Sequence, residues 1–260
     1  MNAQSNLNAA PPMVVEDVSK SYGPVEVLRG LTLRVDPGEV LCIVGPSGVG
    51  KTTLLRCLSG LMPPTAGQIR VADQVVTEPL QEIGLVFQDY RGSLMPWMTT
   101  LENVLLPLRG KKMDIAQARQ RSRECLADVG LSGHEDKYPW ELSGGMQQRV
   151  AIARALAYDS HILLMDEPFG SLDAQTRFDL EDLVLDLRRR LGISIIVVTH
   201  DIDEAVYLAD RVVVLSGKPA TVIDTVPVDL GPVRDQVASK SLAEFSRLRG
   251  RILNEIRRKP

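Results

Sequence analysis

The segment that decides the fold is Gly45-Pro46-Ser47-Gly48-Val49-Gly50-Lys51-Thr52-Thr53. It follows the apolar run 40–44 and precedes the helix-like run 54–58. The order is therefore strand, glycine-rich loop and helix, and the loop fits the pattern G-x-x-x-x-G-K-[ST]. Glycines allow backbone angles that other residues disfavour, and they let the main chain approach a ligand closely.

This glycine loop (residues 45–53) has the chemistry of a phosphate site. Its N–H groups would point into one concavity at the positive end of the following helix. Lys51 can reach terminal phosphates, and the Thr52 hydroxyl is placed to ligate Mg²⁺. The alternative is a plain glycine turn between a strand and a helix. Because the flanking runs also match, the sequence predicts a nucleotide site.

The composition of the chain is that of an ordinary globular protein. The chain has 260 residues, 44% of them hydrophobic and 24% charged, which is ordinary for a globular protein of one large or two small domains. A net charge of -3 gives no reason to expect a nucleic-acid partner. No apolar run approaches the roughly 20 residues of a membrane helix, so another chain would have to supply any membrane span. Residues 1–12, which are polar and small, are expected to be a disordered lead-in.

The pattern of apolar residues divides the chain into a core and an insertion. Residues 13–88 and 158–215 alternate between strand-like and helix-like runs, which is typical of an α/β domain. Residues 89–157 contain helix-like runs only, so we expect a helical insertion there. We place the domain over residues 13–240, with a C-terminal extension over 216–260 that ends in a helix. That extension either covers the core or meets a partner.

Polar residues follow several of the predicted buried strands at the point where each strand ends. They are the glycine loop, Gln88, the pair Asp166-Glu167, and His200. Open α/β sheets bind ligands at the carboxyl edge of their strands, so these groups are expected to form one site. Asp166 could hold a Mg²⁺ ion that bridges terminal phosphates, and Glu167 could accept a proton from an attacking water. The alternatives are a surface loop for the acidic pair and a structural role for His200.

A second glycine-rich helix start lies in the helical insertion. Ser143-Gly144-Gly145, called the SGG segment below, precedes the helix-like run that begins at Met146. A serine and two glycines before a helix again make an anion site. One nucleotide needs only one phosphate loop, so a second anion site in a separate part of the chain suggests that the nucleotide is gripped from two sides.

Together these motifs resemble the ATPase subunit of an ABC transporter, over about residues 13–215. The resemblance rests on the glycine loop, Gln88, Leu142 with the SGG segment, residues 162–168, Ser171-Leu172-Asp173 and His200, in this order. It implies a P-loop NTPase core of the RecA-like α/β class, with N-terminal antiparallel strands and an inserted helical subdomain. The implied activity is ATP hydrolysis, with ATP and Mg²⁺ as ligands.

The resemblance also implies roles for single residues. Two copies would pair head to tail, so that each ATP lies between one chain's glycine loop and the other chain's SGG segment. Lys51, Glu167 and His200 match the catalytic positions, with Glu167 as general base. Thr52, Gln88 and Asp166 match the positions around Mg²⁺. Tyr22, which by itself reads as a surface or packing residue, matches the aromatic residue that stacks on adenine, and Asp173 matches the loop that communicates across the dimer.

The chain is most similar to the group of bacterial importers for nitrate, sulfonates and taurine. This implies membrane permease subunits, an extracytoplasmic solute-binding protein as an indirect partner, and a peripheral location at the cytoplasmic face of the cell membrane. Gly92-Ser93 lengthens the segment in which the permease should dock, and Met146 stands where many members have Gln. The alternatives are a non-transport ABC ATPase and a P-loop kinase for a small molecule, which would leave the SGG segment without a role.

Overall fold

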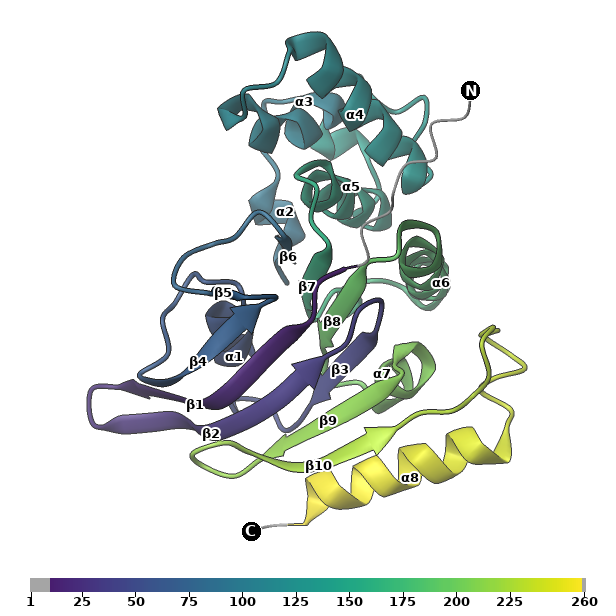
Figure 1. Ribbon diagram of the computed structural model, residues 1–260. Helices are drawn as coiled ribbons and strands as arrows, with labels where there is room; N and C mark the ends of the chain where they lie inside the picture. Colours follow the sequence, from purple (N-terminus) through teal and green to yellow (C-terminus); the bar gives the residue numbers. More distant parts are fainter. Residues whose placement is uncertain (1–9, 259–260) are drawn as a thin grey trace, which may run out of the picture.

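The computed structural model describes residues 10–258, which form two β-sheets and a helical part (Figure 1). The strands are β1 (Met13–Tyr22), β2 (Val25–Val35), β3 (Val40–Val44), β4 (Ala66–Val71), β5 (Gln74–Val75), β6 (Ile83–Val86), β7 (Ile162–Asp166), β8 (Ser194–Val198), β9 (Arg211–Ser216) and β10 (Thr221–Pro227). The α-helices are α1 (Lys51–Leu58), α2 (Tyr90–Ser93), α3 (Thr100–Leu105), α4 (Ile115–Asp128), α5 (Gly144–Ala157), α6 (Ala174–Leu191), α7 (Ile202–Leu208) and α8 (Ala243–Arg257).

The larger sheet has β3 near its middle. Its order is β10-β9-β3-β8-β7-β6, and β3 pairs in parallel with both β8 and β9. Every residue of β3 is buried, which is what an unbroken apolar run predicts for a parallel strand covered on both faces. The smaller sheet is antiparallel, in the order β2-β1-β4-β5. The predicted α/β core with N-terminal antiparallel strands is therefore confirmed.

The larger sheet separates two hydrophobic cores. Leu41 and Ile43 of β3 pack with α1 and the antiparallel sheet. Cys42 and Val44, which point to the other face, pack with residues of α5, α6, α7 and α8. This alternation along one strand gives the molecule three layers, with α1 on the same side of the larger sheet as the antiparallel sheet.

The helical part lies at one end of the molecule, at the top of Figure 1. Within the described chain, residues 89–157 contain helices and no strand. The Asp114 side chain caps α4 by accepting a hydrogen bond from Ala116 N at 3.0 Å. The reason for this helix start is local: a short carboxylate satisfies a free N–H group of the first turn. No helix within residues 10–258 has the length and apolar character that a bilayer span requires.

The described residues near both ends of the chain pack more closely on the core than the sequence predicts. Most of the predicted lead-in, residues 1–9, lies outside the described residues, while Ala10 is buried and Pro12 O accepts from Ala72 N at 2.9 Å. Strand β10 lies in the segment 216–260, for which the sequence predicts only a terminal helix. As an edge strand, β10 has few buried positions, so it lacks an apolar run that sequence could detect.

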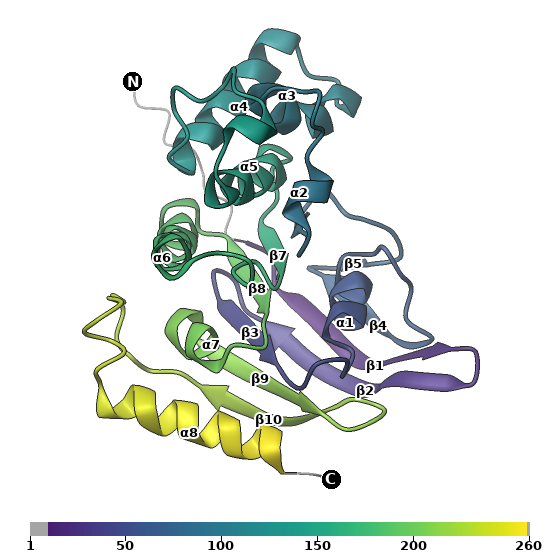
Figure 2. The same cartoon turned by 180° about the vertical axis from the view of Figure 1, so that it is seen from behind.

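The described part of the extension, residues 216–258, packs on the core. Phe245, Leu248 and Ile252 lie on one face of α8 and are buried, and α8 runs along β10 at the edge of the larger sheet (Figures 1 and 2). Arg251 fixes the helix to the sheet through two hydrogen bonds to the Asp224 carboxylate, at 3.0 and 2.9 Å. Of the two uses that the sequence left open for this helix, the structure supports packing on the core.

A buried polar cluster joins α6 to α7. Glu204 is 5% exposed, and its carboxylate accepts a hydrogen bond from Thr199 Oγ1 at 2.6 Å. Arg177 of α6 lies 3.8 Å from Glu204 and 3.5 Å from Asp201, which caps α7. Burial raises the pKa of Glu204 from 4.5 to about 7, against the opposing hydrogen bond from Thr199; Asp201 and Glu181 raise it further and Arg177 lowers it.

We expect Glu204→Gln to gain stability relative to the wild type as the pH rises. Because the folded-state pKa is raised, the favourable neutral form contributes fully below about pH 4.5 and is lost as the pH rises toward about 7. Glutamine does not ionise and can still accept from Thr199. The difference in unfolding free energy should therefore shift in favour of the variant by on the order of 3 kcal/mol between acidic and alkaline buffer, measured by urea denaturation.

Glu39→Gln is the matched control. Glu39 is also buried, but it pairs with Arg211 at the opposite edge of the sheet. Removing that carboxylate should destabilise the protein, because Arg211 loses its partner, whereas Glu204→Gln should stabilise it in alkaline buffer. The contradicting outcome is a difference in unfolding free energy between Glu204→Gln and the wild type that stays constant with pH. The folded state would then not raise the pKa of Glu204.

Candidate functional site

The register of the parallel strands brings the predicted polar residues to one edge of the sheet. Ile43 of β3 lies beside Val198 of β8, and Val198 lies beside Asp166 of β7. On the far side of β7, Met165 lies beside Val86 of β6. The residues that follow these strands therefore emerge side by side, which places the glycine loop, Gln88, Glu167 and His200 at the same carboxyl edge.

The glycine loop needs its glycines for two different reasons. A Cβ atom at Gly45 would lie 2.5 Å from Leu215 O, so β9 leaves no room for a side chain there. Gly48 and Gly50 have φ angles of 74° and 115°, which L-residues rarely adopt. Gly50 is the N-cap of α1 and no side chain caps this helix, so its first N–H groups are available to a ligand.

The other loop residues differ in exposure. Pro46, Ser47 and Thr52 are exposed, Thr53 is half-buried, and Val49 is buried, with its N–H donating to Pro46 O at 3.2 Å. Buried Val49 fixes the loop to the protein, while the residues on either side of it stay exposed. This arrangement is expected of a loop that binds a ligand with its backbone.

Lys51 is buried beside the loop. It is 5% exposed, and its ammonium group donates to Gly45 O at 2.9 Å and to Pro46 O at 3.2 Å. Burial lowers the pKa of Lys51, while the negative charges of Glu167 and Asp166 raise it. The cation is thus held where it faces both the loop backbone and the two carboxylates.

Thr52 and Asp166 offer oxygen ligands. Thr52 Oγ1 lies 3.3 Å from Asp166 Oδ1, and Asp166 is buried at the end of β7. Burial raises the pKa of Asp166, and the hydrogen bond from Thr52 opposes this. Within the described chain no group of three or more His, Cys, Asp or Glu could hold a metal ion alone. This donor set fits Mg²⁺, which commonly takes one or two protein oxygens and completes its shell with phosphates and water.

Glu167 is the centre of a contact between three strand ends. Its carboxylate lies 3.0 Å from His200 Nδ1 and 3.3 Å from Gln88 Nε2. The backbone of Glu167 is left-handed, with φ of 42°, and its N–H donates to Val198 O at 2.8 Å. Such a conformation costs energy and persists only where the surroundings impose it. Here the neighbouring strand β8 imposes it and aims the side chain at the edge.

Tyr22 is the last residue of β1. It pairs with Val25 across the hairpin, and its hydroxyl donates to Met62 Sδ at 3.0 Å. The side chain is 45% exposed, so part of the ring is free to meet a flat ligand.

The SGG segment forms the start of α5, apart from the glycine loop. Ser143 Oγ accepts from Met146 N at 3.3 Å and caps the helix. A Cβ atom at Gly145 would lie 2.2 Å from Thr176 Cγ2, so only glycine fits. Thr176 is in turn held by Asp173, which accepts from its N–H at 3.0 Å and its hydroxyl at 2.7 Å. These bonds, the backbone one first, lower the pKa of Asp173.

The predicted residues thus fall into two groups. One surrounds Lys51 and Glu167 at the sheet edge, and the other surrounds Ser143 and Asp173 at the helix starts. Within residues 10–258 no hydrogen bond or ion pair joins the SGG segment to the glycine loop. Sequence analysis missed the cluster of Thr199, Glu204 and Arg177 behind His200. Its one local signal is an acidic cap followed three residues later by Glu, at Asp201 and Glu204.

Comparison with known proteins gives a consistent result. A family model described as ABC transporter matches residues 28–170. The nitrate import ATP-binding protein NrtD of Synechocystis sp. is 46% identical over 80% of this chain and 77% of its own. The taurine import ATP-binding protein TauB of Pseudomonas aeruginosa is 42% identical over 88% of each chain.

Solved structures agree. CbiO1 of Clostridium perfringens, part of the ABC transporter complex cbiONQ, has a TM-score of 0.75 at 29% identity and covers 84% of this chain and 89% of its own. A dimeric structure of the ATP-binding cassette MJ0796 with ADP and Pi has a TM-score of 0.72 at 34% identity, covering 84% of this chain and 99% of its own. The chain belongs to the ABC transporter ATP-binding family, and it is an enzyme that binds and hydrolyses ATP.

Proposed function

We propose that this chain energises a bacterial importer for nitrate, a sulfonate, taurine or a related small solute. The similar proteins include import ATP-binding proteins for nitrate, taurine and aliphatic sulfonates and a transport ATP-binding protein for bicarbonate. The observation that carries the proposal is the contact of Glu167 with His200 and Gln88 beside the glycine loop, together with a second anion site at the SGG segment.

In this proposal the sheet edge binds the phosphates and orients the reacting water. The loop N–H groups and Lys51 bind the phosphate chain, while Thr52 and Asp166 hold Mg²⁺, with Gln88 nearby. When bound, the ion neutralises charge on the terminal phosphates. Glu167 accepts the proton of the attacking water, and His200, 3.0 Å from it, keeps that carboxylate in position. Tyr22 stacks its exposed face on adenine.

The SGG segment acts on the nucleotide of a second copy. Its helix start carries N–H groups suited to phosphate, yet it makes no hydrogen bond to the glycine loop of its own chain within the described residues. A head-to-tail dimer would bring the two together. Asp173 then senses the partner, because it holds Thr176 against Gly145.

Membrane subunits would dock near Gln88. The large apolar side chains of Phe87 and Trp97 are 45% and 68% exposed and lie on either side of Gln88 in sequence. Exposed aromatic groups of this size are typical of a protein interface. Gln88 links that surface to Glu167, so closure around ATP would be passed to a permease. The chain would then work at the cytoplasmic face of the membrane, and a solute-binding protein outside the cell would deliver the solute.

Glu167→Gln should bind ATP and accumulate as a closed dimer while its turnover falls by at least two orders of magnitude. Glutamine keeps the shape of the side chain but cannot accept the proton, and general-base catalysis contributes roughly 10²–10⁴-fold. Single-turnover hydrolysis and size-exclusion chromatography with ATP would measure the two effects. Turnover near that of the wild type would remove Glu167 as the base.

Mixing two inactive variants should restore activity. Lys51→Ala damages the glycine loop, and Ser143→Arg damages the SGG segment. In a mixed dimer both changes fall in the same shared site, so the other site is intact. An equal mixture should recover about a quarter of the wild-type rate if pairing is random.

The ATPase rate of each variant assayed alone provides the baseline for this experiment. If glycine loop and SGG segment of one chain formed the site, the mixture would stay as inactive as its components. That result would exclude the shared site and leave the assignment of Glu167 standing.

The importer assignment can be tested with the membrane partner. Co-purified with its permease and reconstituted in vesicles, the chain should hydrolyse ATP faster when the solute-loaded binding protein is present. Trp97→Ala should abolish this coupling and retain the basal rate. Stimulation by none of nitrate, taurine, sulfonate or bicarbonate would reject the proposed solute class.

A further inference from the structure

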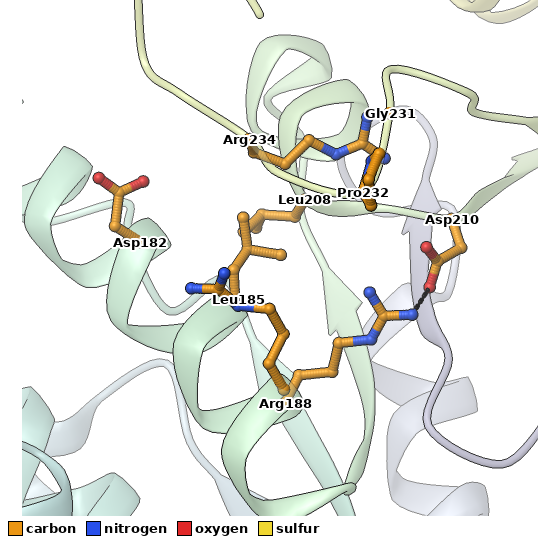
Figure 3. Close-up of a pocket in the computed structure, with 9 residues that line it drawn as sticks. Asp182, Leu185, Arg188, Leu208, Asp210, Gly231, Pro232 and Arg234 are labelled. Atoms are coloured by element: carbon orange, nitrogen blue, oxygen red, sulfur yellow. Dashed lines mark hydrogen bonds and ion pairs between the residues drawn. The ribbon is translucent and has the colours of Figure 1, made fainter.

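A cavity lies far from the glycine loop, at the amino edge of the larger sheet. It has a volume of about 230 Å³ and is bounded by α6, the end of α7 and the segment 231–234 (Figure 3). Arg188 marks its position in the fold, because it donates to Gly38 O, just before β3, and to Asp210, just before β9. None of the residues assigned above to ATP lines this cavity. The lining residues are Asp182, Leu185, Arg188, Arg189, Leu208, Asp210, Gly231, Pro232 and Arg234.

Positive charge exceeds negative charge around this cavity. Three guanidinium groups line it, against two carboxylates that are already engaged. Asp210 Oδ2 accepts from Arg188 at 2.7 Å and from Val40 N at 2.9 Å. Asp182 Oδ1 accepts from the Tyr207 hydroxyl at 2.6 Å and from Gln236 at 2.9 Å. One oxygen of each carboxylate is therefore occupied, and neither carboxylate forms an ion pair with Arg189 or Arg234 among the described residues.

Arg234 is the cation with the fewest acceptors. Its Nη2 donates to Ala209 O at 3.2 Å, but its Nη1 is buried and has no partner within the described residues. None of the ion pairs described involves it. Burial lowers the pKa of Arg234, Asp210 opposes this, and the like charge of Arg188 lowers it again. Arg234 as a whole is half-buried, and Asp210 and Asp229 supply negative charge nearby, but its Nη1 atom has given up water without an equivalent acceptor, which is unfavourable.

Arg189 faces the same cavity with a weak partner. It reaches Asp186 on its own helix at 3.4 Å, and its side chain is 55% exposed. Such a surface pair contributes little, so its guanidinium can turn to another anion at small cost. Leu185 and Leu208 supply an apolar wall to the cavity, and Gly231 and Pro232 belong to a segment without regular secondary structure (Figure 3).

We propose that this cavity is a binding site for a small oxyanion, held between Arg234 and Arg189. Planar guanidinium groups match the oxygen pairs of carboxylate, phosphate and similar anions. Arg234 and Arg189 both line the cavity, so their side chains border the same space. The volume of about 230 Å³ is below the roughly 300–1,000 Å³ of pockets for drug-sized ligands, so a nucleotide is too large. This site is independent of the proposed transport function.

The test is calorimetric titration of the intact protein with phosphate, nitrate, bicarbonate and acetate, each at constant ionic strength. The glycine loop is first saturated with a non-hydrolysable ATP analogue and Mg²⁺, so that its terminal phosphate position is filled and does not compete for the anion. We expect saturable binding of at least one anion, with one site per chain. Arg234→Gln should weaken it about tenfold or more, as expected for the loss of a charge-assisted hydrogen bond.

Arg189→Gln is the second variant, because an exposed side chain can be changed without risk to folding. It should weaken binding in the same direction, whereas Arg123→Gln on the exposed side of α4 should not. Both pocket variants should keep the basal ATPase rate. Absence of saturable binding by every anion, or binding unchanged in both pocket variants, would overturn the proposal. Binding lost only in Lys51→Ala would assign the anion to the glycine loop and overturn it as well.

Discussion

The parallel pairing of β3 with β8 and β9 is the constraint on which the rest of the structure depends. A strand buried on both faces is apolar along most of its length, so functional polar side chains are found where the strand ends, as Asp166 is in β7. Polar chemistry is moved to the residues that follow each strand. Because the register fixes where the strands end, it also fixes which polar groups meet: Lys51 from the loop after β3, Glu167 after β7 and His200 after β8.

The same constraint explains the local strain and the tight contacts around the site. Glu167 keeps a left-handed backbone because β8 holds its N–H group. Gly45 cannot be larger because β9 passes directly beside it, and Gly145 cannot because Thr176 does. The parts proposed to bind nucleotide are thus built against rigid neighbours, which would keep them close to a productive geometry before any ligand arrives.

Much of this arrangement could be predicted, because its signals are local. The glycine loop, the buried strands and the helix starts at Asp114 and Ser143 each show in a few consecutive residues. The cluster of Glu204, Thr199 and Arg177 could not, since it forms only when α6 and α7 pack together. Strand β10 was missed because an edge strand needs few apolar residues. Tyr22 acquired a role only through resemblance, since an isolated aromatic residue has no pattern.

The separation of the SGG segment from the glycine loop has a kinetic consequence. In the proposed dimer, neither chain holds a complete site, so the rate per chain should fall as the protein is diluted below its association range. A permease that holds two copies side by side would replace bulk concentration with a fixed local one. Hydrolysis would then be slow for chains that drift free and fast for those that are docked. Assembly itself would limit the waste of ATP.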